Sequence, residues 1–453
     1  MSNANGHQAP ADEENIITLK GMYEDYFLDY ASYVILERAI PAVYDGFKPV
    51  QRRIMHAMKE MDDGRYNKVA NIIGSAMQYH PHGDASIGDA IVNLGQKDLL
   101  IDTQGNWGDV RTGDSAAAPR YIEARLSKFA LEVVFNPQTT EWQLSYDGRK
   151  KEPVTFPVKF PLLIAQGVEG IAVGLSTKML PHNFCEILQG CIAILKGKKV
   201  KLFPDFLTGG KIDVTDYNDG KRGGKVRVRA AIEEVDKSTL AIRDIPYGTT
   251  TTSLIESIVK ANDKGKIKVK QVVDNTAKDI EILVNLAPGT SPDITMDALY
   301  AFTDCEVSIS PNACVIVDDK PQFLGISDIL QQSVDQTVDL LRKELEIEKA
   351  ELKEKIFFSD LLKIFINEGM YKHPDYENSG DLQKCYEVLN ELFTPFFDQF
   401  YREIENEDYK HLIDKPLSSI TRFDTSKVEA QIKELQEKIE KVDYNLDHLT
   451  DFA

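Results

Sequence analysis

A long run of regularly spaced apolar residues near the end of the chain constrains the fold more than any other feature. Its positions alternate steps of four and three, which keeps them on one stripe of a helix and is typical of a coiled coil. A second run with this spacing starts at Val334 and is interrupted only by Glu348. Together they predict a long antiparallel helical arm. The runs are Val428, Ile432, Leu435, Ile439, Val442, Leu446 and Leu449, and Val334, Val338, Leu341, Leu345, Leu352 and Ile356.

The segment between these two runs is rich in aromatic residues and predicts a compact helical knob at the tip of the arm. We expect the apolar knob to form a dimer contact, with a monomeric helical hairpin as the alternative. Its aromatic residues include Phe357, Phe358, Phe365, Phe393, Phe396, Phe397, Phe400 and Tyr401.

The net charge of −19 argues against a nucleic-acid-binding protein, but the acidity is unevenly distributed. From Asp335 to the end there are 16 lysines and arginines against 28 aspartates and glutamates. Between Arg38 and Lys128 the counts are 12 and 11, and His56, His80 and His82 lie there too. The first part of the chain can therefore carry the local basic surface that phosphate contacts require.

Length and composition indicate a multidomain protein of the cytoplasm. A chain of 453 residues predicts about two to four domains, and no apolar run is long enough to span a bilayer. The first 15 residues are polar and acidic, so we expect no signal peptide. The five cysteines show no Cys-x-x-Cys spacing and indicate reduced thiols: Cys185, Cys191, Cys305, Cys314 and Cys385.

The first 60 residues predict two helices. Residues 20–40 carry an apolar stripe and end at Pro41, which indicates a core helix or a subunit-docking helix. A turn at Asp45–Gly46 then opens a helix that carries Ile54, Met55 and Met58. Three cations lie at the start of this helix, where backbone N–H groups also favour an anion: Lys48, Arg52 and Arg53. They indicate an anion-binding site or, equally well, a solvated basic face.

Two further helices, at 66–79 and at Ala85–Leu94, are joined by a short turn and suggest a helix-turn-helix with a glycine-rich wing after it. We expect Asp84 to cap the second of them. In the turn, His80 and His82 admit three interpretations. They are ordinary turn histidines, metal ligands together with Asp84, or hydrogen-bond donors to DNA phosphates.

The glycine-rich segment leads to Arg120-Tyr121. Ile122, Leu126 and Phe129 recur at steps of four and three, so we expect Tyr121 at the start of a helix. A tyrosine in such a place is usually a core residue with a satisfied hydroxyl. Our hypothesis is that its phenol oxygen attacks a DNA phosphodiester, with Arg120 stabilising charge on the phosphate.

Residues 152–321 change to an α/β pattern, with a helix at Ser253–Asn262. The glycine-rich run 167–174 lacks the register of a nucleotide-binding loop, so we expect no ATP site here. Within it, Ile171 could wedge into a DNA base step, but a buried strand residue is the commoner case. The expected strands are Leu162–Ala165, Val226–Ala230, Leu240–Ile245, Ile280–Leu286 and Cys314–Val317.

From about Met22 to its end, the chain resembles the A subunit of bacterial type IIA topoisomerases, which is the breakage-reunion component of gyrase and topoisomerase IV. The resemblance implies a multidomain α+β fold. Its parts are a winged-helix DNA-gate domain in residues 1–150, an α/β tower domain in 151–325, and a coiled coil with a dimerisation knob in 326–453. The motifs that carry it are Arg38–Pro41, Asp45–Arg53, His80–Asp84, Gln104–Gly108, Ala118–Tyr121 and Gly170–Gly174.

The resemblance also implies roles for individual residues. Tyr121 would form the 5′-phosphotyrosyl link, Arg120 would stabilise the transition state, and Ile171 would bend DNA. The remaining DNA contacts would come from Lys48, His80 and His82, with Arg38, Arg52 and Arg53 nearby.

The implied enzyme is an ATP-dependent type II topoisomerase of the nucleoid, which is active only as an A2B2 complex with its B subunit. An acidic domain of the B subunit would hold most of the Mg²⁺, and ATP would bind to the B subunit too. This fits a chain that contains no Asp-x-Asp and for which we expect no metal site.

Three departures or details refine the resemblance. The family often has serine directly after His-Pro-His-Gly-Asp, where quinolones anchor, but this chain has Ala85 there while Asp89 keeps its acid. We therefore expect reduced quinolone sensitivity, which an unchanged drug response of Ala85→Ser would contradict.

The chain also stops inside the returning helix, without the family's C-terminal DNA-wrapping domain, which indicates a fragment. Gln51 and Trp107 resemble topoisomerase IV more than gyrase.

The favoured function is therefore decatenation and relaxation of DNA, and supercoiling as part of a gyrase is the alternative. A different class, a non-catalytic dimeric winged-helix DNA-binding protein, predicts binding without cleavage. A third, a metal hydrolase built on His80, His82 and Asp84, predicts stoichiometric metal in the purified chain.

Overall fold

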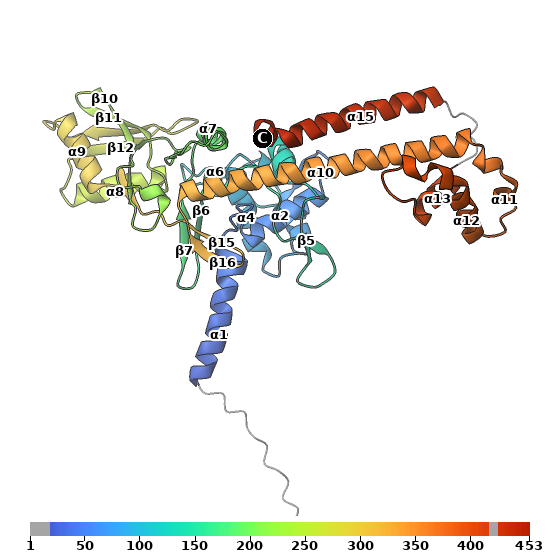
Figure 1. The fold of residues 1–453 in the computed structure, drawn as a ribbon. Coiled ribbons are helices and arrows are strands. Elements are labelled where there is room, and N and C mark those ends of the chain that lie inside the picture. The colour runs from blue at the N-terminus through green and yellow to red at the C-terminus, as the bar shows by residue number, and fades with distance from the viewer. Residues whose placement is uncertain (1–18, 416–424) are drawn as a thin grey trace, which may run out of the picture. The chain divides into compact units, whose positions relative to one another are not determined.

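The computed structural model describes residues 19–415 and 425–453, so the expectation for the first 15 residues lies outside the described part. The chain forms two compact units, Met1–Gln336 and Thr337–Ala453 (Figure 1). None of the described helices is both long and apolar enough to cross a membrane.

The first unit begins with the helices that the sequence predicted. Helix α1 (Leu19–Val34) continues as the π-helical turn η1 (Ile35–Ala39) and ends before Pro41. Its first part stands away from the unit, as Figure 1 shows, and Tyr26, Phe27 and Tyr30 are exposed. The three helices that follow pack together around Ile54, Ile72 and Ile91, and are α2 (Pro49–Glu60), α3 (Val69–Ala76) and α4 (Asp84–Gln96).

Helix α4 starts one residue earlier than expected. Gly83 occupies the N-cap position, and Asp84 is the first helical residue. The Asp84 carboxylate instead accepts a hydrogen bond from the backbone N–H of Ala85 at 2.9 Å. An acidic group in the first turn still complements the positive end of the helix.

A three-stranded antiparallel sheet has the strand order β1 (Asn67–Lys68), β3 (Glu123–Leu126) and β2 (Ile101–Gln104), with β1 immediately before α3 and the other two strands after α4. The predicted helix at Tyr121 is therefore wrong. Ile122, Ala124 and Leu126 are buried in alternation, because apolar residues four apart also face one side of a strand. Helix α5 (Lys128–Val133) begins only after Ser127, whose side chain caps it.

The segment Leu162–Ala165, predicted as a strand, is part of helix α6 (Leu162–Gln166). A short buried apolar run fits either structure, so its sequence alone does not decide. Helix α7 (Phe184–Leu195) follows a hairpin of β6 (Val168–Ile171) and β7 (Ser176–Met179). The other elements here are hairpins β4 (Trp142–Leu144)–β5 (Lys151–Pro153) and β15 (Cys314–Val317)–β16 (Lys320–Phe323), turn η2 (Asn218–Gly220), and the sheet β14 (Glu306–Ile309), β9 (Val226–Arg229), β8 (Lys211–Asp213).

One hydrophobic core connects the α2–α4 helices to the hairpins β6–β7 and β15–β16, and its residues extend from Val43 to Leu330. It is continuous across residue 150, where the sequence suggested a domain boundary. The boundaries at 150 and 325 stay predictions.

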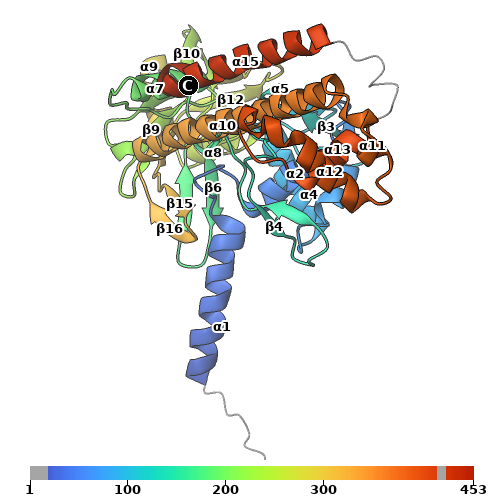
Figure 2. The ribbon, with the colours of Figure 1, turned by 45° about the vertical axis from the view of Figure 1, so that its right-hand side comes forward.

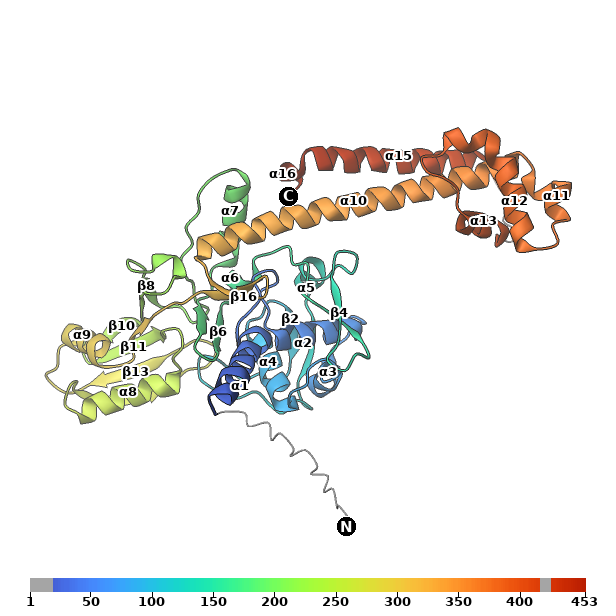
Figure 3. The same ribbon diagram turned by 60° about the horizontal axis from the view of Figure 1, so that its bottom comes forward.

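A four-stranded sheet in the same unit has its own core. Its strand order is β10 (Ala231–Asp236), β11 (Thr239–Asp244), β13 (Ile282–Leu286) and β12 (Val269–Asp274). Helices α8 (Thr251–Asp263) and α9 (Pro292–Phe302) lie beside it in Figure 3. The predicted strands at 226, 240, 280 and 314 and the helix at 253 are thus confirmed.

The second unit contains most of the 42-residue helix α10 (Ile326–Asn367), which starts earlier than Val334, and the helix α15 (Thr425–Asp447). The two run side by side in Figure 2. They are antiparallel, because Lys349 pairs with Asp443 and Lys363 pairs with Glu429 at 2.7 Å. Leu345, Leu352, Val442 and Leu449 are buried along this pair.

Short helices at the far end of α10 form a small separate core, and α16 (Leu449–Phe452) ends the chain. Of the eight aromatic residues expected on a dimer surface, Phe357, Phe365 and Phe393 are buried in this core, and Phe397 and Tyr401 are exposed. The other three are partly buried against the core: Phe358, Phe396 and Phe400. The helices are η3 (Met370–Lys372), α11 (Pro374–Glu377), α12 (Leu382–Phe393), η4 (Thr394–Gln399) and α13 (Asn406–Ile413).

Candidate functional site

Tyr121 lies in a turn immediately before β3, and its side chain is 62% exposed. Its backbone N–H donates to the carbonyl of Ala118 at 2.8 Å. The carbonyls on either side of it, at Pro119 and Ile122, accept from the first N–H groups of α3, each at 3.1 Å. These bonds fix the turn against a helix, while the phenol has no hydrogen-bond partner among the described residues.

Arg120 lies directly against this phenol. Its guanidinium carbon is 4.6 Å from the centre of the Tyr121 ring, and its side chain forms no ion pair with another described residue. A phosphate held at the phenol oxygen would therefore lie within reach of a free guanidinium, which can form two parallel hydrogen bonds to it. The pair combines a nucleophile with a group that stabilises negative charge.

The glycine-rich loop before Tyr121 is hydrogen-bonded to the start of α8 and to the loop between β12 and β13. The Arg111 guanidinium donates to the carbonyl of Lys278 at 2.9 Å, and the Arg111 carbonyl accepts from Thr251 at the start of α8 at 2.8 Å. Gly108 has a φ of +74°, and a side chain there would clash with the carbonyl of Asp114 at 2.3 Å. The bonds of Arg111 and the close packing of Gly108 against Asp114 therefore fix the conformation of this loop.

His80 is buried, and its Nδ1 accepts from the Arg53 guanidinium at 3.3 Å. Burial and the neighbouring charge of Arg53 lower the pKa of His80 to about 4, so its ring is neutral near pH 7. Since a guanidinium can only donate, the neutral ring carries its proton on Nε2. Arg53 itself is paired with Glu152 at 2.8 Å.

His82 lies beside His80 with ring centres 4.8 Å apart, and its Nε2 is hydrogen-bonded to the Tyr33 hydroxyl. Each histidine thus has one ring nitrogen engaged by protein. No group of three or more His, Cys, Asp or Glu side chains within residues 19–415 and 425–453 is arranged to hold a metal ion. His80, His82 and Asp84 therefore do not form the three-ligand metal site that a hydrolase at this turn would need.

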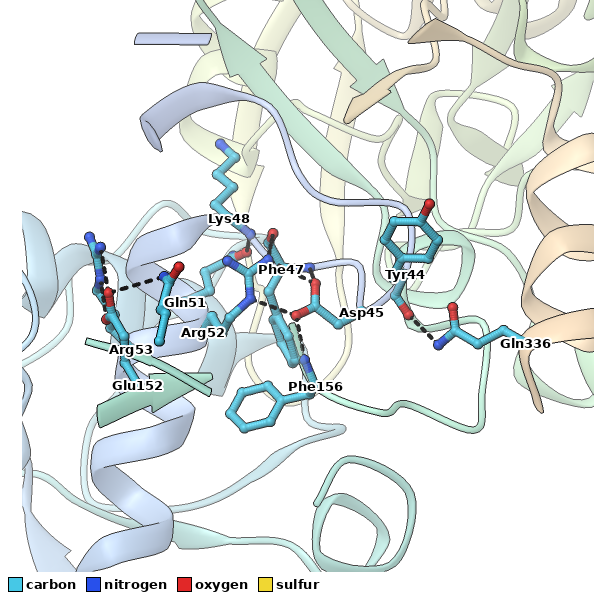
Figure 4. Close-up of polar contacts among 11 residues, drawn as sticks. Tyr44, Asp45, Phe47, Lys48, Gln51, Arg52, Arg53, Glu152, Phe156 and Gln336 are labelled. Atoms are coloured by element: carbon cyan, nitrogen blue, oxygen red, sulfur yellow. Dashed lines mark hydrogen bonds and ion pairs between the residues drawn. The ribbon is translucent and has the colours of Figure 1, made fainter. Parts of the chain in front are cut away.

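The Arg52 side chain stabilises the fold through a buried ion pair. Its guanidinium is buried against the Asp45 carboxylate, with Nε–Oδ2 2.6 Å and Nη2–Oδ1 3.0 Å (Figure 4). The same carboxylate accepts from the backbone N–H groups of Phe47 and Phe156, each at 3.0 Å. Arg52 therefore holds the turn before α2 together and does not present its charge to solvent.

Lys48 binds the backbone of the β6–β7 hairpin that carries Ile171. The Lys48 ammonium donates to the carbonyl of Glu169 at 2.6 Å, and burial lowers the pKa of Lys48. Ile171 ends β6 and is 88% exposed, so the commoner expectation of a buried strand residue is wrong. Arg38, at the end of η1, is exposed.

Ala85 and Asp89 are both exposed and lie four residues apart on α4, so they share one face of this helix. Sequence reasoning missed Lys97, Glu152 and Tyr33. Nothing in the sequence marks them, because their partners lie 70, 99 and 49 residues away.

Comparison with known proteins places the chain in a family. The family that comprises the A subunits of DNA gyrase and topoisomerase IV matches residues 38–452. The A subunit of DNA topoisomerase 4 from Borreliella burgdorferi is 42% identical over 96% of this chain and 69% of its own length. The A subunit of DNA gyrase from Halalkalibacterium halodurans is 32% identical over 91% of this chain and 52% of its own length.

The chain belongs to this family of DNA gyrase and topoisomerase IV A subunits, whose enzyme class is the type II DNA topoisomerases. It spans about half the length of the gyrase relatives and somewhat more of the topoisomerase IV relative.

Proposed function

We propose that this chain is the strand-cleaving A subunit of a topoisomerase IV, acting in decatenation and relaxation of DNA. The observation that carries the proposal is the exposed Arg120–Tyr121 pair on a turn fixed by backbone bonds to α3. The higher identity to the topoisomerase IV relative favours this subfamily over gyrase. A decatenation-versus-supercoiling assay on the full-length protein distinguishes the two.

The finer architecture is part of the proposal. Helices α2–α4 with the sheet β1-β3-β2 would form a winged-helix DNA-gate domain, and the β10–β13 sheet with α8 and α9 the tower. The antiparallel pair α10–α15 would be a coiled coil, and the knob at its end would join two copies into a dimer. Its exposed residues Leu382, Phe397 and Tyr401 are available for such a contact.

The Arg120–Tyr121 pair can carry out strand cleavage in one reversible step. The Tyr121 phenol loses its proton to solvent, and its oxygen attacks the phosphorus of a phosphodiester. The bond to the 3′-oxygen breaks, this oxygen takes up a proton, and the 5′-phosphate stays linked to the tyrosine. Arg120 offsets charge on the phosphate oxygens, and attack by the 3′-hydroxyl reverses the step without a new energy source.

The DNA-binding surface in this proposal has a part that contacts DNA, in which Arg38 is exposed and Lys48 and His82 are half-buried, and a supporting part. Arg38, Lys48 and His82 would contact phosphates, and Ile171 would wedge into a base step. Behind them, Arg52, Arg53 and His80 hold the α2 and α4 starts in place through the bonds described above.

Mg²⁺ and ATP would be bound mainly by a B subunit, in an A2B2 complex that acts on double-stranded DNA in the cytoplasm at the nucleoid. No step above passes through a metal held by this chain. The altered position Ala85, with Asp89 on the same face of α4, would lower quinolone sensitivity.

The test is covalent capture of DNA by the chain in the presence of Mg²⁺ and its B subunit. The wild type should give protein-linked cleaved DNA, and Tyr121→Phe should give none, because only the phenol oxygen can form the ester. Tyr146→Phe, an exposed tyrosine elsewhere in the same unit, is the matched control and should cleave normally.

Protein-linked DNA from Tyr121→Phe would contradict the mechanism. Binding with no cleavage by the wild type under all partner and metal conditions would favour the non-catalytic DNA-binding dimer instead.

A further inference from the structure

Two lysines from different helices hold the base of the β6–β7 hairpin that carries Ile171. Lys97 directly follows α4, and its ammonium donates to the carbonyl of Gly167 at 3.1 Å. Lys48 directly precedes α2, and its ammonium donates to the carbonyl of Glu169 at 2.6 Å. Gly167 immediately precedes β6 and Glu169 is its second residue, so the two lysines bind the backbone at the start of this strand.

This strand has little freedom elsewhere along its length. Gly167 has a φ of +62°, and a side chain there would approach the carbonyl of Met179 to 2.8 Å. A side chain at Gly170 would meet the carbonyl of Ala39 at 2.1 Å. The backbone of β6 thus fits closely between η1 and β7, and the two lysines bind the carbonyls of Gly167 and Glu169 at its start.

We propose that Lys97 is a positioning residue for DNA bending, which links the end of α4 to the hairpin and sets the angle at which Ile171 enters the duplex. The inference rests on the proposed function, because it assigns Lys97 a task in presenting Ile171 to DNA. Lys97 does not touch DNA in this arrangement and acts through the Gly167 carbonyl.

The charge state of Lys97 should control the strength of this contact. Burial, and then the charge of Lys48, lower the pKa of Lys97 to about 8, while Glu169 opposes the shift. The charged groups that act on Lys97 are therefore Lys48 and Glu169. Glu169 is in turn paired with Lys178 of β7 at 3.0 Å and lies close enough to Tyr247 for its charge to act on that phenol. Below its pKa Lys97 is charged and bonds strongly to the carbonyl, and above it the neutral amine bonds more weakly.

The experiment measures DNA bending by energy transfer between the ends of a labelled duplex, with the A2B2 complex, at about pH 7 and about pH 9. For the wild type we expect about threefold fewer bent complexes at the higher pH, as the charge-assisted bond weakens. Lys97→Met keeps the apolar stem without the charge, and should bend DNA weakly at both values. Lys97→Arg keeps the charge, and should bend DNA equally well at both.

Controls separate this inference from the proposed function. Lys237→Met, an exposed lysine between β10 and β11, should match the wild type, and thermal unfolding checks that each variant is folded. Wild-type bending by Ile171→Ala would contradict the wedge, and this inference with it. Reduced bending by Ile171→Ala, together with a wild-type pH profile for Lys97→Met, would contradict the role of Lys97 alone.

Discussion

At the scale of residues, the cations that look alike in the sequence have different tasks in the structure. Lys48, Arg52 and Arg53 lie within six residues and suggested one basic face. Arg52 is instead buried with Asp45, Arg53 is bound to Glu152, and Lys48 reaches β6. A sequence gives the number of charges, but not the carboxylates that neutralise them from 99 residues away.

The buried pair predicts a large effect on stability. Asp45→Ala would leave the Arg52 guanidinium with only the Phe47 carbonyl as acceptor, and the N–H groups of Phe47 and Phe156 with none. Loss of one partner of a buried ion pair costs about 3–5 kcal/mol, so we expect a fall of that size in the free energy of unfolding, measured with urea. Glu256→Ala, which removes an exposed pair with Lys260, should leave the unfolding curve nearly unchanged. A similar fall in the free energy of unfolding in both variants would mean that the buried Asp45 contributes no more to stability than an exposed carboxylate.

At the scale of elements, the long periodic helices and the later strands were predictable, and the surroundings of Tyr121 were not. A spacing of four residues fits a helix or one face of a strand, and only pairing of β3 with β1 and β2 decides between them. Burial of Ile171 could not be judged either, because a hairpin that projects from a core looks in sequence like a strand within it.

The close fit of β6 against η1 predicts a response to a single added methyl group. In Gly170→Ala the new carbon would lie 2.1 Å from the Ala39 carbonyl, which is backbone and cannot rotate away. We expect a loss of about 1–3 kcal/mol in unfolding free energy, typical of overpacking.

Gly74→Ala is the matched control, because a side chain there, within α3, meets nothing within 4 Å. It should raise stability by up to about 1 kcal/mol through helix propensity. Equal effects of the two substitutions would show that η1 and β6 separate easily.

At the scale of the whole molecule, the chain has separate cores on either side of residue 336. The sequence suggested a boundary at 325, through the change from mixed patterns to heptad spacing and aromatic clusters, and that boundary stays a prediction. The sequence could not show that the aromatic residues of the knob are mostly its own core, because an apolar residue reads the same in a core and at an interface.

Separate cores predict separate unfolding transitions, since cooperativity extends only as far as continuous packing. Phe393 is fully buried in the knob and Ile54 is fully buried between α2 and its neighbours. Truncating a buried Phe or Ile to alanine costs about 2–5 kcal/mol. In scanning calorimetry at one protein concentration, Phe393→Ala should lower only one transition and Ile54→Ala only the other. A single transition that both substitutions shift equally would mean that α10 couples the two units into one cooperative structure.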